Sequence, residues 1–168
     1  MNNIFKITLT FYFKFIIFSI FAILNTAHST SADYVVRGKT VIDLRNGLEW
    51  MRCSHGQNYD NEKCLGNVVR LNQKQVEVVL KKLNLEGNGF WRLPSKKELE
   101  MILCNECDPP KINEIIFPST AKEPYWTGQK NWISPKNYWS VNFMTGYSYG
   151  RFFPQKELAI RFVKNRQK

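Results

Sequence analysis

Histidine is scarce in this chain, which has only His28 and His55. No cysteine follows Cys107, and no internal repeat or low-complexity tract is present. An active site usually gathers a nucleophile, a base and a group that orients the base, and a zinc site gathers three or four nitrogen or sulfur ligands. The chain offers few such residues, so we expect no catalytic residue, no metal ion and no cofactor.

Long apolar runs are also absent, with one exception near the N-terminus. Residues 15–24 form a ten-residue apolar run that follows two lysines and leads into small residues. A membrane-spanning helix needs about 20 apolar residues, whereas this pattern is typical of a secretory signal peptide. We therefore predict a signal peptide over residues 1–32, cleaved after Ala32 or Ser29, and an exported single domain over 33–168 without a membrane span, in the periplasm or at the cell surface. An uncleaved N-terminal anchor is the alternative, because aromatic residues lengthen the apolar segment.

Acidic residues are outnumbered, with 14 aspartates and glutamates against 24 lysines and arginines and a net charge of +10. The expected signal peptide carries two lysines and no acid, so its removal lowers the net charge to +8. A basic surface favours polyanions such as acidic or sulfated glycans, lipopolysaccharide, nucleic acid or an anionic membrane. Export argues against cytosolic nucleic acid as the partner. The same charge could also serve solubility alone.

Four cysteines, Cys53, Cys64, Cys104 and Cys107, are an even number in a chain that we expect to be exported, which favours disulfides. Three pairings are possible, and the grouping in the sequence favours Cys53–Cys64 and Cys104–Cys107. In redox proteins a Cys-x-x-Cys motif opens a helix, whose dipole lowers the thiol pKa. Here the motif follows an apolar helical run and precedes two prolines, so we interpret it as a staple that closes a loop. Cys53 and His55, which are two residues apart, are a weak catalytic candidate, because a disulfide would block the thiol.

The first part of the chain predicts strands followed by a helix. β-Branched and aromatic residues predict strands at 34–36 and 40–42, and alternation after a turn predicts a strand at 48–51. The segment between the first two cysteines has the composition of a loop. Apolar residues spaced by three and four predict a helix within residues 68–83.

The stretch FWRLPSKKEL, residues 90–99, raises the question of why Trp-Arg-Leu-Pro directly precedes a helix start. Ser95 and Glu98 have the spacing of a capping box, so they predict the start of a second, short helix. Trp91 is most simply a core anchor. In an extended chain Arg92 points away from its two apolar neighbours, so its role is not explained by local structure.

Short strands and turns dominate the second half. Aromatic and β-branched residues predict strands at 125–127, 138–143, 152–153 and 159–163, with a turn at 144–147. Together with the two helices these strands predict an α+β domain.

Five elements in a fixed order resemble a known family. Residues 41–50 are similar to the pattern D-x-x-T/N-G-L-x-W, and residues 90–99 to W-R-L-P-T/S-x-x-E-L. The segments 112–118, 125–127 and 139–146 follow in the same order. The chain thus resembles the DUF1566 family, also named for the C-terminal domain of the Legionella collagen-like adhesin, over about residues 38–164.

The resemblance implies an exported bacterial domain with a C-type-lectin-like α+β fold. In the adhesin this domain is thought to bind sulfated glycans. The chain departs from the family at Phe162, where the closing strand often carries a cysteine, and it lacks a collagen-like Gly-x-y region. The first departure removes a long-range disulfide partner and strengthens the local pairing of Cys104 with Cys107.

The resemblance also implies structural roles for the motif residues Trp50, Trp91, Arg92, Pro94 and Trp139. Trp126 and Trp139 occupy motif positions and are expected in the core. We expect Arg92 to pair with a buried carboxylate, with Asp43 and Glu49 as candidates.

Cations lie among aromatic residues in the second half of the chain. An aromatic face can stack on a sugar ring while lysine or arginine pairs with its sulfate or carboxylate. The candidate ligand-binding residues are Lys130, Trp132, Lys136, Tyr147, Tyr149 and Arg151. Trp132 lies in a predicted loop, either as a ligand contact or as an anchor of that loop.

The sequence therefore predicts an exported, non-catalytic binding module for acidic or sulfated polysaccharide at the bacterial envelope or surface. A structural or assembly protein of the envelope, which binds a protein partner, is the competing class.

Overall fold

The computed structural model of the chain describes residues 33–86 and 90–166. The expected signal peptide lies outside these described residues, so its prediction stays open. Within the described residues, no helix has both the length and the apolar character needed to cross a bilayer.

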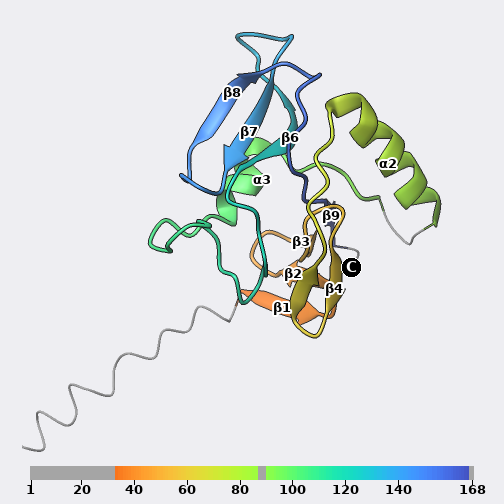
Figure 1. The fold of residues 1–168 in the computed structure, drawn as a ribbon, viewed down its shortest axis with the longest axis vertical. Helices are drawn as coiled ribbons and strands as arrows, with labels where there is room; N and C mark the ends of the chain where they lie inside the picture. Colours follow the sequence, from red (N-terminus) through yellow and green to blue (C-terminus); the bar gives the residue numbers. More distant parts are fainter. Residues whose placement is uncertain (1–32, 87–89, 167–168) are drawn as a thin grey trace, which may run out of the picture. The chain divides into compact units, whose positions relative to one another are not determined.

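One antiparallel sheet joins the two ends of the described chain, in the order β1-β2-β3-β9 (Figure 1). Its strands are β1 (Tyr34–Arg37), β2 (Thr40–Asp43), β3 (Leu48–Met51) and β9 (Val163–Asn165). Gly38 and Gly47 take positive φ angles of 56° and 65° in the two tight turns, a conformation that is cheap only for glycine. Leu48 and Trp50 are buried on β3, whereas Glu49 and Met51 are partly exposed on the opposite face.

A second antiparallel sheet has the order β6-β7-β8 and lies beside α2 in Figure 1. It consists of β6 (Pro124–Lys130), β7 (Tyr138–Asn142) and β8 (Ser148–Phe152). The strand predicted at 152–153 is therefore wrong in position, since β8 ends at Phe152. The strand predicted at 159–163 is also displaced. Residues 158–160 make backbone hydrogen bonds with Leu71, Trp126 and His55, and the paired strand β9 begins only at Val163.

The segment between Cys53 and Cys64, predicted as a loop, contains a small hairpin of β4 (Asn58–Asp60) and β5 (Lys63–Leu65). Asn61 and Glu62 connect the strands with positive φ angles of 44° and 64°. Two left-handed residues give the turn a twist that matches the strands. Glutamate rarely adopts this conformation, so residues 61–62 carry no clear turn signal.

Both predicted helices are present. The first is α2 (Gln73–Glu86). At its start the side chains of Asn72 and Gln75 accept hydrogen bonds from each other's backbone N–H groups, which forms a capping box that was not predicted. In α3 (Lys96–Met101) the predicted capping box of Ser95 and Glu98 is confirmed. The structure is thus a mixed α+β fold of two helices and small antiparallel sheets.

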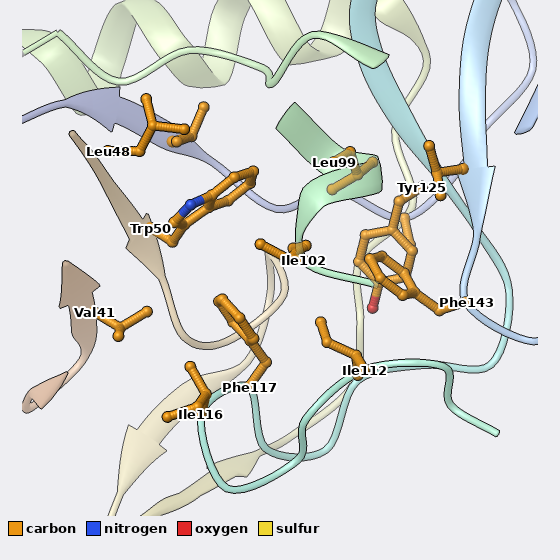
Figure 2. Close-up of a cluster of buried hydrophobic side chains, with 13 residues drawn as sticks. Val41, Leu48, Trp50, Leu99, Ile102, Ile112, Ile116, Phe117, Tyr125 and Phe143 are labelled. Carbon is orange, nitrogen blue, oxygen red and sulfur yellow. The ribbon is translucent and has the colours of Figure 1, made fainter. Parts of the chain in front are cut away.

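Two groups of buried side chains hold the elements together. The larger one lies between the four-stranded sheet, α3 and the 112–117 loop, and Trp50 and Phe117 meet edge to face within it (Figure 2). The smaller one lies beneath α2 and contains Val76, Trp91 and Trp126. Apolar burial at about 25 cal/mol per Å² makes these clusters the main source of stability.

Candidate functional site

The loop between β6 and β7, residues 131–137, presents its aromatic residue to solvent. Asn131 is buried and its side-chain amide donates to the Gly150 carbonyl at 2.9 Å. Its side-chain oxygen accepts from the Ile133 N–H at 3.0 Å, and its own N–H donates to the Asn137 carbonyl at 2.8 Å. These bonds fix the loop without Trp132, which is 82% exposed. Asn131, and not Trp132, therefore anchors this loop. The role of Trp132 as a ligand contact stays a prediction.

Beside this loop the surface is hollowed. The hollow has a volume of about 400 Å³ and is lined by Lys130, Pro135, Lys136, Tyr138, Phe153, Pro154 and Gln155. The Lys130 ammonium lies 5.7 Å from the centre of the Tyr138 ring, within cation–π range. Two lysines and two aromatic rings line the hollow, and no carboxylate is among its lining residues.

The structure brings together only some of the predicted binding residues. Lys130, Trp132 and Lys136 lie at the β6–β7 loop, whereas Tyr147 precedes β8 at the opposite end of β7 (Figure 1). At about 3.3 Å per residue, the five residues of β7 separate these ends by roughly 16 Å. Tyr149 and Arg151 project from β8 between them, and Tyr149 packs edge to face on Phe152. The six residues therefore form no single contiguous site, and Tyr147 is the outlier.

The motif tryptophans divide into core and surface. Trp50 and Trp126 are fully buried, and Trp91 is nearly so. Trp139 is only half-buried, so its predicted place in the core is wrong. Its ring lies across Gly150, and the Lys96 ammonium stands 5.1 Å from the ring centre. The indole therefore contacts both the sheet surface at Gly150 and the Lys96 ammonium.

Arg92 pairs with Glu98, and the expected partners Asp43 and Glu49 are wrong. Asp43 instead accepts two hydrogen bonds from Asn46 in the turn after β2. Glu49 pairs with Lys164 across the sheet, at 3.3 Å. The Arg92 side chain turns toward the start of α3, where the Glu98 carboxylate is already held by the Ser95 N–H at 2.7 Å. Pro94 is buried at this corner, and its carbonyl accepts from the Gly128 N–H.

Both disulfides have the pairing that the grouping favours, Cys53–Cys64 and Cys104–Cys107. No cysteine of the described residues is free, so none offers a thiol for the Cys53/His55 chemistry considered above. Disulfides are consistent with an exported protein. The first closes the segment that carries the β4–β5 hairpin, and the second follows α3.

A larger cleft, of about 660 Å³, lies between the four-stranded sheet and α2, at residues that the sequence pattern did not predict as a site. Its lining comes from β1, β2, β3, the 53–59 segment, α2, Trp91 and the region of β9. One sequence signal for this cleft was available. Met51 is an apolar residue on the face of β3 that points away from the main core, which indicates a second apolar surface. His55 also lines the cleft, and burial lowers the pKa of its imidazole.

Comparison with known proteins bears on the family. No curated protein and no solved structure matches the chain, so the C-type-lectin-like part of the fold stays a prediction. The family model of the Lcl C-terminal domain matches residues 39–164, which include both helices, both disulfides and every described strand except β1 and the last residue of β9. The chain therefore belongs to the Lcl C-terminal domain family.

Proposed function

We propose that this protein is an exported, non-catalytic binding module for acidic or sulfated glycans at the bacterial envelope or surface. The binding site is the hollow at the β6–β7 loop together with Trp132. The observation that carries the proposal is the lining of this hollow, in which Lys130 and Lys136 stand beside aromatic rings with no carboxylate among them.

The chemistry of the hollow suits a sugar that carries negative charge. The exposed faces of Trp132 and Phe153 offer apolar surface on which a sugar ring can stack. The two lysines can pair with sulfate or carboxylate groups on either side of that ring. Because these cations are exposed, each contact is weak alone, and affinity depends on several contacts along a polymer. Arg151 on β8 extends the basic surface.

Heparin, as a sulfated polysaccharide, provides the test. The purified protein is eluted from a heparin column with a salt gradient, beside Lys130→Glu/Lys136→Glu and Trp132→Ala. A matched control, Lys63→Glu/Lys81→Glu, makes the same charge change at exposed lysines of β5 and α2. Polyelectrolyte contacts weaken with salt in proportion to their number, so loss of the site moves elution to lower salt.

The expected order is late elution of the unchanged protein and of the control, and early elution of the site variant. Trp132→Ala should elute between them, because stacking is lost while charge is kept. If the site variant and the control shift equally, net charge alone explains retention and the proposed site is wrong. If the unchanged protein elutes from heparin no later than expected from its net charge, and instead captures a defined envelope protein, the assembly role is favoured.

A further inference from the structure

The cleft between the four-stranded sheet and α2 is basic at one end and apolar at the other. We propose that it binds a small amphipathic anion, a molecule with one carboxylate or sulfate head and an apolar body. This site is separate from the glycan site proposed above and does not depend on it.

The strand register gives the cleft its length. Arg37 on β1 pairs with Thr40 on β2, and Thr40 pairs with Met51 on β3. The Met51 N–H then donates to the Phe162 carbonyl at 3.0 Å, just before β9. Trp91 precedes the residue that bridges to Val163 on the far side of β9. Neighbouring strands are about 4.8 Å apart, so the row from Arg37 to Trp91 spans roughly 20 Å.

Positive charge gathers at the β1 end of this row. Arg37 and Lys39 are both exposed and lie on either side of Gly38. Gln57 and Asn58 line the cleft as well and add polar side chains. The neighbouring Tyr59 is tied to the β1–β2 turn by Arg52, which donates to the Tyr59 hydroxyl at 2.6 Å and to the Gly38 carbonyl at 3.2 Å. This end can therefore hold an anionic head between two cations and neutral amides.

The two carboxylates of the lining do not oppose a head at that end. Glu49 is engaged by Lys164, with 3.3 Å between the ammonium and the carboxylate. Glu86 ends α2, where Asn84 bonds the Trp91 backbone through its side chain at 2.8 and 2.9 Å. Glu86 thus lies toward the Trp91 end. It is paired with Lys82, with 3.9 Å between the ammonium and the carboxylate, so it too does not oppose a head at the β1 end.

The other end is lined by apolar groups. Val79 and Leu83 of α2 line the cleft together with Met51 and Phe162, and these residues belong to or pack against the cluster that contains Trp91. The Lys164 ammonium lies 4.6 Å from the centre of the Trp91 ring, so the lysine stem and the indole form one surface. His55 packs edge to face on Phe162, with its pKa lowered by burial, so it adds no charge at neutral pH. An apolar body would be desolvated here while its head stays near Arg37.

Octanoate, 1-octanol and acetate together test the proposal, because they present the whole amphiphile, the body alone and the head alone. Each is titrated into the purified protein by calorimetry, with NMR detection of the Met51 methyl and the Trp indole signals. The variant is Arg37→Glu/Lys39→Glu, and Lys63→Glu/Lys81→Glu is the matched control.

We expect saturable binding of octanoate, with shifts at Met51 and Trp91 and none at Trp132. Acetate and 1-octanol should bind at least tenfold more weakly. The Arg37/Lys39 variant should lose at least tenfold in octanoate affinity, and the control should lose less than threefold. Absence of saturable binding, shifts centred on Trp132, or equal losses in the two variants would each overturn the proposal. Heparin elution is a separate readout, so failure of either proposal is recognised without the other.

Discussion

Arg92 and Glu98 form a two-point ion pair at the start of α3, with Nη1 2.7 Å from Oε2 and Nη2 2.7 Å from Oε1. Nη2 also donates to the Asn165 side chain at 2.9 Å, and the Arg92 backbone exchanges hydrogen bonds with Val163. The Trp-Arg-Leu-Pro stretch is therefore a structural corner. Its tryptophan enters the core beneath α2, and its arginine joins a helix start to the closing strand.

Arg92→Ala is expected to reduce stability and leave glycan binding unchanged. Two charge-assisted hydrogen bonds are lost and the Glu98 carboxylate loses its partner, but Arg92 is 38% exposed, so we expect a cost of about 1–2 kcal/mol. Urea unfolding measures the cost, and heparin elution measures binding. Arg45→Ala is the control, because its pair with Asp33 is far more exposed and should contribute under about 0.5 kcal/mol. Unchanged stability with lost heparin retention would contradict the structural role.

Acid should weaken the fold partly through Glu98. Its pKa is lowered mainly by the Arg92 hydrogen bonds, so the folded state favours the ionised carboxylate. For a carboxyl with a depressed folded pKa, the stabilisation is complete above its ordinary pKa near 4.5 and is lost as pH falls through the lower folded value.

Glu98→Gln should therefore be less stable at pH 7 and should show a smaller loss of stability below pH 4.5 than the unchanged protein. Urea midpoints measured between pH 3 and 7 provide the comparison. Parallel pH profiles for the two proteins would rule out this contribution of Glu98.

Local signals predicted much of the fold. The capping box at Ser95 was readable because a helix start depends on residues three apart. The strands at 34–36, 40–42 and 48–51 were readable because alternation and turn residues are also local, and the structure extends two of them by one residue. The β4–β5 hairpin was missed because its turn places Asn61 and Glu62, not glycine, in the left-handed region.

Site geometry depended on contacts that no local pattern specifies. The exposure of Trp132 could be predicted because the residue lies in a loop. The distance between Tyr147 and Trp132 could not be predicted, because it depends on how β7 and β8 pair. The partner of Arg92 could not be predicted from local pattern, because Glu98 serves both as the capping residue of α3 and as the ion-pair partner of Arg92. The cleft beside α2 was unpredictable, because its lining comes from segments more than 100 residues apart.

Gly150 and Trp139 are coupled across β7 and β8. A β-carbon at Gly150 would lie 2.8 Å from two atoms of the Trp139 ring and 2.9 Å from the Asn131 amide nitrogen. Gly150→Ala should therefore displace the indole and cost about 1–3 kcal/mol. Combining it with Trp139→Ala should restore part of the loss, because the clash with the ring is removed while the close contact with Asn131 remains. Thermal unfolding of the two single variants and the double variant measures the coupling, and simple additivity would contradict it.

Arg161 is a buried cation that is held by neutral groups. Its Nη1 donates to the Met51 carbonyl at 3.0 Å and to the Arg52 carbonyl, and its Nη2 donates to the Thr120 hydroxyl at 2.7 Å. The guanidinium stands 4.8 Å from the centre of the Phe117 ring. Burial lowers its pKa to about 10, so it remains protonated at neutral pH.

Arg161→Lys and Arg161→Met should both destabilise the protein, by about 2–4 kcal/mol, because methionine offers no donor and lysine cannot supply all of the acceptors that the guanidinium serves. Lysine keeps the charge but cannot present donors in a planar fork, so it should not rescue the fold. Arg151→Met, which removes an exposed arginine of β8, is the control and should change stability by under about 0.5 kcal/mol. Guanidinium unfolding at pH 7 gives the comparison. If Arg161→Lys were as stable as the unchanged protein, the positive charge alone would be what matters. The hydrogen bonds of the guanidinium would then not be needed to join the end of β3, Thr120 and the segment before β9.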